Sequence, residues 1–321
     1  MKFFQELHKI IEEELISIKY PSSPDNLYQP IEYVLNIGGK RMRPILTLMA
    51  HQLFNSDIQK SVKSAIAIEV FHNFTLLHDD IMDEAPLRRG VKTVHEKWDK
   101  NTAILSGDTM LVQSYNLLMN VEDEKLRSVL EVFNKAAKEV CEGQQWDMDF
   151  EKREDVSISE YLKMIEYKTS VLLAASLKIG AINAGATEKE ANHIYEFGKN
   201  MGIAFQLKDD LLDTFGNPET FGKQVGGDIL SNKKTYLYLK AIEVSDKKDR
   251  EDLMSYFSDE NNNETKVDAV RSIFSELEIP RLTTNLMKEY HDNAMIHLDS
   301  IQSENKEPLL VFSELLLNRT V

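Results

Sequence analysis

Residues 62–85 contain neither glycine nor proline and are mostly apolar until three aspartates appear near their end. A run of this length and composition predicts a buried helix. With about 100° per residue on an ideal helix, Asp79 and Asp83 lie about 40° apart and Asp80 lies on their flank. The three carboxylates therefore converge on one face of the predicted helix, where they could bind a cation.

A second aspartate triplet repeats this spacing in another apolar segment, at Asp209, Asp210 and Asp213. One acidic run is usually a solvated helix face, but two copies inside apolar sequence favour a binding role. Because burial of an unpaired carboxylate costs several kcal/mol, six aspartates in apolar helices imply bound cations or basic partners. Oxygen ligands on a rigid scaffold suit Mg²⁺ better than zinc or iron, so the sequence predicts magnesium as the cofactor.

The rest of the chain indicates an all-α fold. At 321 residues it is long for one domain, but no Ser-, Gly- or Pro-rich linker divides it. It contains only 13 Gly and 8 Pro, and apolar residues recur with a period of about 3.6 almost throughout. We therefore expect one large helical domain over residues 1–321.

Charge and cysteine usage restrict the class of protein. The net charge of −15 argues against nucleic acid and anionic membrane surfaces as partners. The single cysteine, Cys141, fits a reducing cytoplasm, and we expect a buried, inert thiol. Residues 1–18 alternate apolar and acidic residues, so they predict an amphipathic helix and neither a signal peptide nor a stable membrane insertion.

Basic residues occur beside these motifs. Two glycines at positions 38 and 39 precede Lys40, Arg41 and Arg43, which could present cations at the start of the next helix. An ordinary helix end followed by basic surface residues explains this segment equally well. After a turn at Pro86, residues 88 and 89 are both arginine, and two guanidiniums beside a cation site can clamp diphosphates in bidentate fashion.

These motifs together resemble the trans-isoprenyl diphosphate synthases, also called polyprenyl synthetases, over nearly the whole chain. The resemblance implies a single helical bundle around a central apolar cavity. It also implies magnesium-assisted, head-to-tail condensation of isopentenyl diphosphate with an allylic diphosphate to an all-trans product. Homodimerisation is expected from the family alone.

The resemblance also implies a role for each basic or polar residue that matches the family's motifs. All six aspartates would be metal ligands. Isopentenyl diphosphate would contact Lys40, Arg43, His72 and Arg89. The allylic diphosphate would contact Arg88, Lys168 and Thr169, with Gln206 beside the substrate and Lys223 and Lys233 covering the diphosphate as a lid. Ionisation of the allylic substrate would depend on Asp79, Asp80, Asp83, Arg88, Lys168, Asp209 and Lys223. The family's usual glycine before the second lid lysine is replaced by Asn232.

Product length is expected to depend on residues before the first triplet. In the family an aromatic residue five positions before the first aspartate limits elongation, and Phe74 occupies that position, with Phe71 and Thr75 nearby. This pattern looks like that of a 20-carbon, geranylgeranyl diphosphate synthase. The alternatives are a farnesyl or longer polyprenyl diphosphate synthase and a non-catalytic partner subunit of a heteromeric synthase. A terpene cyclase should lack the isopentenyl diphosphate residues, and a purely structural helical protein would need no such basic clusters.

Overall fold

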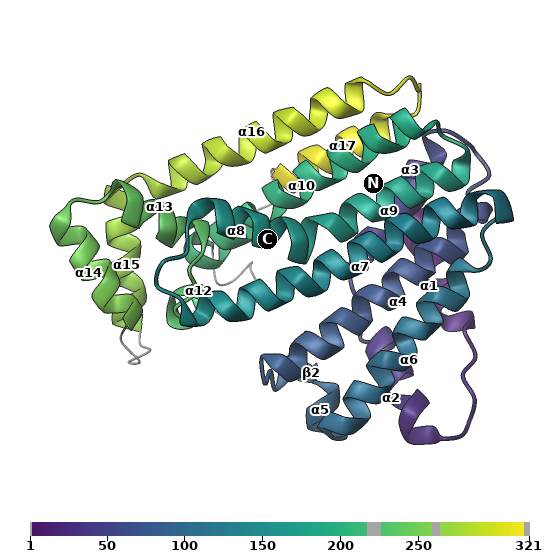
Figure 1. Ribbon diagram of the computed structural model, residues 1–321, viewed down its shortest axis with the longest axis horizontal. Coiled ribbons are helices and arrows are strands. Elements are labelled where there is room, and N and C mark those ends of the chain that lie inside the picture. The colour runs from purple at the N-terminus through teal and green to yellow at the C-terminus, as the bar shows by residue number, and fades with distance from the viewer. Residues whose placement is uncertain (1, 217–225, 259–263, 318–321) are drawn as a thin grey trace. The chain divides into compact units, whose positions relative to one another are not determined.

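The computed structural model describes residues 2–216, 226–258 and 264–317, and helices dominate these ranges (Figure 1). The predicted all-α class is confirmed, since the one sheet found in the described ranges is a hairpin of two residues per strand. The elements are α1 (Lys2–Ser17), α2 (Asp25–Asn36), α3 (Met42–Gln52), α4 (Gln59–Met82), β1 (Leu87–Arg88), β2 (Val91–Lys92), α5 (Val94–Lys97), α6 (Lys100–Leu118), α7 (Asp123–Lys152), α8 (Ile158–Ile165), the π-helix η1 (Glu166–Ser170), α9 (Val171–Ala184), α10 (Glu188–Phe215), α12 (Gly227–Leu230), α13 (Tyr236–Val244), α14 (Lys247–Ser258), α15 (Glu264–Glu276), α16 (Ile279–Asp299) and α17 (Glu307–Leu317).

The chain divides into two compact units, which are described separately. Unit 1 comprises Met1–Asn134, Ala175–Ile194 and Ser303–Asn305. Unit 2 comprises Lys135–Ala174, Tyr195–Gln302 and Lys306–Val321. None of the helices in the described ranges combines the length and the apolar character that crossing a bilayer requires.

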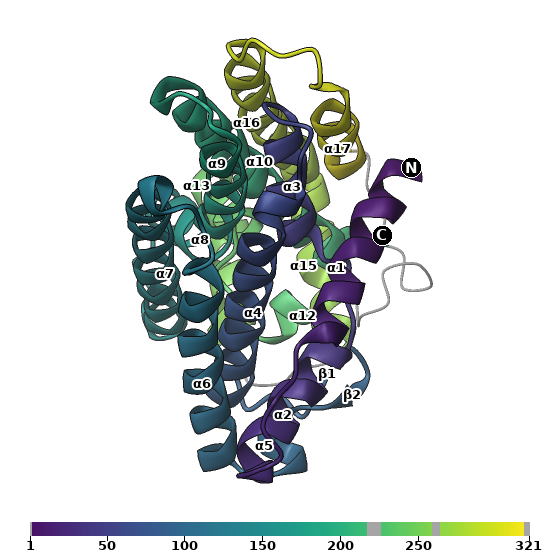
Figure 2. The same ribbon diagram turned by 90° about the vertical axis from the view of Figure 1, so that its right-hand side faces the viewer.

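Unit 1 is built around α4, which packs against α3 and α6 and also contacts α1 (Figure 2). The side chains of Ile66, Ile68 and Val70 are fully buried, as expected for a helix that has neighbours on several sides. Gly180 lets α9 approach α3 closely in this unit. A Cβ on Gly180 would lie 2.0 Å from the backbone oxygen of Thr47 in α3.

Arg41 joins three helices of unit 1. It is only 3 % exposed, and its backbone is left-handed, with φ of 46°. Its guanidinium donates to Glu12 Oε1 at 2.7 Å, to Glu69 Oε1 at 2.8 Å and to the Leu35 oxygen at 2.6 Å. Our expectation that Arg41 presents its cation to a ligand is therefore wrong, because the left-handed turn directs the side chain inward onto the buried Glu69.

The β-hairpin of unit 1 follows directly after the first aspartate triplet. Its two-residue turn consists of Arg89 and Gly90, with φ of 52° and 79°, the conformation that matches the twist of paired strands. Tyr33 of α2 donates its hydroxyl to the Lys92 oxygen at 2.7 Å. This contact fixes β2, and therefore β1 with Arg88, to the rest of the unit.

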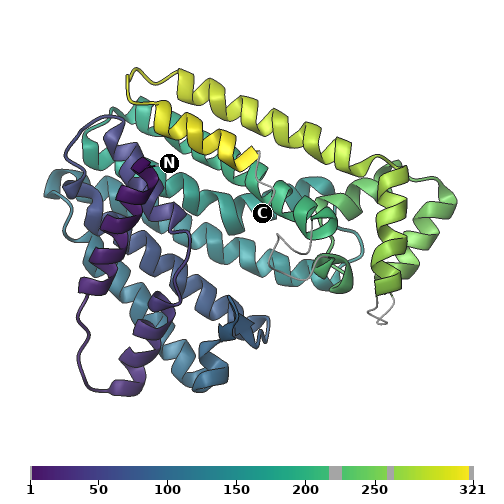
Figure 3. The same cartoon turned by 180° about the vertical axis from the view of Figure 1, so that it is seen from behind.

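Unit 2 contains two apolar clusters. The first gathers Tyr161, Met164 and Ile165 with Leu207 and Met287, and the second is built by α13, α14 and α15. Helices α16 and α17, drawn in yellow, lie side by side in Figure 3. The expectation of a buried Cys141 is wrong: α7 turns this residue to the surface while the preceding valine is buried.

Candidate active site

The first aspartate motif lies at the carboxyl end of α4, as its position in the sequence predicts. Asp80 is buried at 5 % exposure, Asp79 is half-buried, and Asp83 is exposed at the helix C-cap. Arg88 of the hairpin donates through Nε to both oxygens of Asp80 at 2.9 Å, and its Nη2 lies 2.7 Å from Oδ1. A basic partner, one of the two possibilities raised by the sequence, therefore compensates the buried carboxylate.

Three of the residues assigned to isopentenyl diphosphate gather in unit 1. Arg43 Nη1 lies 3.0 Å from His72 Nε2, and within the described part of the chain the buried Arg43 Nε has no acceptor. Arg89 contacts the backbone of Gly39, where an added Cβ would lie 2.5 Å from its Nη1. Lys40, the next residue, is exposed. The result is a compact cationic cluster beside a glycine.

Electrostatics in this cluster favour an anionic ligand. Burial lowers the pKa of His72 well below its usual range, and the positive charges of Arg43 and Arg89 lower it further. His72 is therefore a neutral hydrogen-bonding group at physiological pH. Burial also lowers the pKa of Arg43 and Arg89, partly offset by Glu69. A bound diphosphate would supply the negative charge that these guanidiniums lack.

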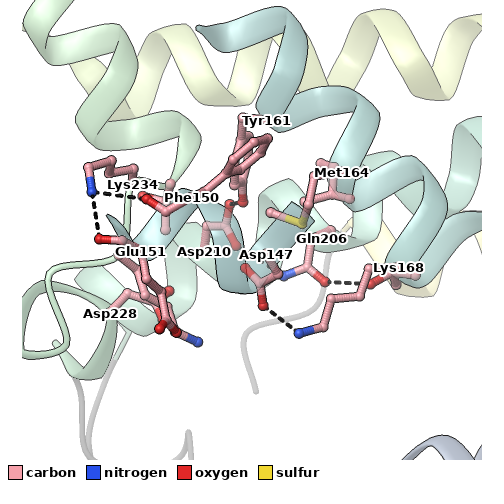
Figure 4. Close-up of a pocket in the computed structure, with 14 residues that line it drawn as sticks. Asp147, Phe150, Glu151, Tyr161, Met164, Lys168, Gln206, Asp210, Asp228 and Lys234 are labelled. Carbon is pink, nitrogen blue, oxygen red and sulfur yellow. Dashed lines mark hydrogen bonds and ion pairs between the residues drawn. The ribbon is translucent and has the colours of Figure 1, made fainter. Parts of the chain in front are cut away.

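The second aspartate motif borders a cavity of about 170 Å³ in unit 2 (Figure 4). Five of the residues that the resemblance selects in this unit line it together: Lys168, Thr169, Gln206, Asp210 and Lys233. The other lining residues are Asp147, Phe150, Glu151, Tyr161, Met164, Ile165, Asp228, Lys234 and Thr235.

Asp210 is held by a chain of hydrogen bonds on the cavity wall. Its Oδ2 accepts from the hydroxyl of Tyr161, and its Oδ1 accepts from Gln206 Nε2 at 3.0 Å. Gln206 in turn accepts from Thr169 Oγ1 at 3.2 Å. Burial raises the pKa of Asp210 to about 8 and nearby Asp228 adds to the increase, while the two hydrogen bonds offset part of it. A cation beside Asp210 would relieve this unfavourable burial of negative charge.

The outer aspartates of the second motif, Asp209 and Asp213, are half-exposed. Asp213 Oδ1 accepts the backbone N–H of Asp228 at 2.9 Å, which fixes the start of α12. In the described ranges, no three His, Cys, Asp or Glu side chains are grouped closely enough to form a complete metal site. This donor set suits Mg²⁺, which commonly takes one or two carboxylates and completes its shell with water and substrate phosphates. The expectation that all six aspartates are buried is wrong, because only the middle one of each triplet points into its unit.

Lys168 reaches the cavity from η1. Its Nζ lies 2.5 Å from Asp147 Oδ2 of α7, so a carboxylate compensates its charge. Lys233 is exposed, and its Nζ lies 3.8 Å from Asp228 Oδ1. Lys234 donates to the oxygens of Phe150 and Glu151 at 3.0 and 3.3 Å, and so caps the last turn of α7.

The residues expected to limit product length lie in unit 1 on α4. The Phe74 ring lies 4.7 Å from the ring of His78 and 5.5 Å from that of Phe71, which lies 5.1 Å from Phe133 of α7. Thr75 donates its hydroxyl to the His72 oxygen. His78 contacts α6 so closely that a Cβ on Gly107 would lie 2.3 Å from its Nε2. Phe74 is therefore held in an aromatic row on the α4 face that packs against α6 and α7.

A family model, described as polyprenyl synthetase, matches residues 24–274 of the chain. The chain belongs to the polyprenyl synthetase family. A geranylgeranyl diphosphate synthase of Methanosarcina mazei is 42% identical over 239 residues, which cover 74% of this chain and 73% of that protein. A short chain isoprenyl diphosphate synthase of Methanocaldococcus jannaschii is 39% identical over 81% of this chain and 79% of its own length.

Solved structures agree with this assignment. A crystal structure of a geranylgeranyl pyrophosphate synthase matches this polyprenyl synthetase with a TM-score of 0.94 and 48% identity, covering 99% of both chains. The geranylgeranyl pyrophosphate synthetase of Pyrococcus horikoshii matches with a TM-score of 0.92 and 33% identity, over 99% of this chain and 98% of that one.

One departure from the family pattern has a clear structural reason in this polyprenyl synthetase. Asn232 replaces the expected glycine and has a left-handed backbone, with φ of 55°, a conformation that asparagine tolerates better than most residues. Its side chain accepts from Lys266, a buried lysine, at 2.6 Å. The other expected lid residue, Lys223, lies outside the described residues.

Sequence reasoning assigned no role to several residues that line the cavity of this polyprenyl synthetase, notably Asp147, Tyr161, Asp228 and Lys234. Spacing could have identified Tyr161, because residues 161 and 165 precede the predicted ligand Lys168 at helical intervals. No local signal identifies Asp147, whose ion pair with Lys168 joins two helices.

Proposed function

We propose that this polyprenyl synthetase condenses isopentenyl diphosphate with an allylic diphosphate, head to tail, and that its main product is 20-carbon geranylgeranyl diphosphate. The observation that carries the proposal is the grouping of Lys168, Thr169, Gln206 and Asp210 around one cavity. The resemblance assigned the first three, from separate segments, to the substrate and Asp210 to the metal. Two relatives that are 42% identical are named geranylgeranyl synthases, which supports the product length. A geranylfarnesyl diphosphate synthase at 40% identity keeps a longer product as the second candidate.

In the proposed reaction the allylic carbon–oxygen bond breaks and its electron pair leaves with the diphosphate. The isopentenyl double bond then attacks the allylic cation to form a carbon–carbon bond, and a proton leaves to the released diphosphate. Lys168 and Lys233 of unit 2 would stabilise the leaving diphosphate. Each charge pair near 4 Å contributes about 4 kcal/mol at an effective dielectric of about 20 before desolvation. Arg43, Arg89 and neutral His72 would hold isopentenyl diphosphate.

Magnesium is the proposed cofactor, and when bound it supplies further positive charge to the diphosphate oxygens. In unit 1 the residues that would hold magnesium are Asp79, Asp80 and Asp83. In unit 2 they are Asp209, Asp210 and Asp213. We further propose that the two units act as one domain, because a single family model runs through residues of both. The cytoplasm is the proposed location, on the basis of the single cysteine.

Product analysis tests the proposed function. With magnesium, isopentenyl diphosphate and farnesyl diphosphate, we expect a 20-carbon product from the wild type and a longer product from Phe74→Ala, because the smaller side chain removes the barrier to elongation. Phe74→Leu, which keeps most of the volume, should resemble the wild type. Mass spectrometry reads the chain length.

Two results would contradict these expectations. A wild-type product beyond 25 carbons would exclude Phe74 as the limit to elongation. No condensation with farnesyl, geranyl or dimethylallyl diphosphate would favour a non-catalytic partner subunit instead.

A homodimer is also part of the proposal. Four exposed apolar residues of α6 and its C-cap, Ile104, Leu105, Val112 and Met119, recur at intervals of seven or eight and form one stripe, with exposures of 42, 59, 60 and 61 %. Such a stripe on a helix suits burial against a second copy of the chain. We expect the wild type to be a dimer in light scattering, and Leu105→Glu with Val112→Glu to be a monomer.

Ile296→Glu is the matched control, because Ile296 is equally exposed, at 63 %, but lies on α16. It should leave the dimer intact. A monomeric wild type, or a double variant that stays dimeric, would exclude the α6 stripe as the dimer contact.

A further inference from the structure

The π-helix η1 carries both Lys168 and Thr169, and it interrupts an otherwise continuous helical path from α8 to α9. A π-turn is wider than an α-turn and is intrinsically unfavourable, so such a turn persists where its surroundings hold it. The packing around η1 shows which neighbours do so.

Two glycines on different helices contact the backbone of η1. A Cβ on Gly143 of α7 would lie 2.3 Å from the Lys168 nitrogen and 2.8 Å from its Cα. A Cβ on Gly202 of α10 would lie 2.6 Å from Ser170 Cβ and 2.7 Å from Ser170 Cα. All four distances are far inside van der Waals contact, so only glycine lets α7 and α10 approach η1 this closely.

Each glycine also precedes, by one helical turn, the residue that holds a functional side chain of η1. Asp147 follows Gly143 on α7 and pairs with Lys168. Gln206 follows Gly202 on α10 and accepts from Thr169 Oγ1 at 3.2 Å. Residues four apart lie on the same helix face, so the depth of each glycine contact sets the distance of the polar contact one turn later.

We propose that Gly143 and Gly202 are positioning residues that hold η1 from two sides and thereby fix Lys168 and Thr169 for the diphosphate of the allylic substrate. The proposal rests on the proposed prenyl-transfer function. At Gly143 the obstacles to a larger residue are backbone atoms, which cannot rotate away. Alanine would therefore displace α7 from η1 by about 1 Å, and a misplacement of that size can cost roughly 100-fold in rate.

The test compares Gly143→Ala and Gly202→Ala with Gly180→Ala. The control variant creates an equally close contact, against the Thr47 oxygen in unit 1, away from η1. For the first two variants we expect the KM for farnesyl diphosphate to rise about tenfold or more and kcat to fall about 10- to 100-fold. The KM for isopentenyl diphosphate should stay within about twofold. Binding of inorganic diphosphate with magnesium, measured by calorimetry, should weaken in parallel.

Gly180→Ala should lower the midpoint of thermal unfolding by about as much as Gly143→Ala and Gly202→Ala do. It should leave the KM for farnesyl diphosphate and the affinity for inorganic diphosphate unchanged. If Gly180→Ala raises the KM for farnesyl diphosphate and weakens diphosphate binding as much as Gly143→Ala does, the effect is general destabilisation and the proposal is overturned. Gly143→Ala with wild-type diphosphate affinity would overturn it as well.

A second variant covers the case in which Gly143→Ala does not fold. Ser170→Gly removes two of the three η1 atoms that an alanine at position 202 would meet, namely Ser170 Cβ and Oγ. Ser170→Gly combined with Gly202→Ala should therefore bind inorganic diphosphate more tightly than Gly202→Ala alone. If the double variant binds inorganic diphosphate no more tightly than Gly202→Ala, the contact between position 202 and Ser170 does not control this binding, and the proposal is overturned for Gly202. A wild type that neither binds diphosphate nor condenses the substrates would instead overturn the proposed function.

Discussion

Replacement of Lys168 by alanine is expected to lower kcat by roughly 10²–10³-fold, with a smaller change in the KM for isopentenyl diphosphate. Lys168 is the cavity cation that η1 presents, and removing one preorganised group that stabilises developing negative charge typically has an effect of this size. Steady-state kinetics with farnesyl diphosphate and isopentenyl diphosphate measures both constants.

Lys163→Ala provides the matched control. Lys163 lies five residues earlier, is more exposed, and pairs with Glu166 at 3.0 Å outside the set of residues that line the cavity. We expect its kcat to stay within about twofold of the wild type, as for a surface ion pair. If Lys168→Ala has the same kcat as this control, Lys168 does not stabilise the leaving diphosphate.

Replacement of Arg41 by methionine is expected to destabilise the protein by about 3–5 kcal/mol, because it leaves the buried Glu69 without its guanidinium partner. The same change also removes the link from α4 to Glu12 of α1 and to the Leu35 oxygen. Thermal and urea unfolding should show a clear decrease in the midpoint, which is the measurement that checks this expectation.

The double variant Arg41→Met with Glu69→Leu distinguishes this explanation from a simple loss of packing. Removing both charges removes the unpaired buried carboxylate, so much of the lost stability should return. Unfolding midpoints that are the same for the single and double variants would show that Glu69 is not the source of the destabilisation.

The magnitudes of these two effects reflect different environments. Lys168 is half-buried in a cavity open to ligands, so its loss should mainly lower the activity toward diphosphate substrates. Arg41 is only 3 % exposed and its partners are fixed by three helices, so its loss should lower the stability of the unliganded protein.

The sequence pattern alone determined the fold class of this protein and the positions of its two aspartate triplets. Helical periodicity and the scarcity of glycine and proline predicted the all-α class, and the Asp-Asp-x-x-Asp spacing placed two aspartate triplets near the ends of long helices. The family motifs selected Arg43, His72 and Arg89, which the structure brings into one cluster. The all-α prediction is confirmed, because helical periodicity fixes which residues share a face. The ligand roles of Arg43, His72 and Arg89 stay predictions.

Tertiary structure decided what spacing cannot specify. Only packing determines that Arg41 turns inward, that the middle aspartates are buried while the outer ones are not, and that Cys141 is exposed. Tyr161 and Asp147 became parts of the site through contacts with Asp210 and Lys168 on other helices. The physical reason is that burial and charge compensation depend on neighbours distant in the sequence, and a glycine such as Gly143 gains its importance only from the backbone that it contacts.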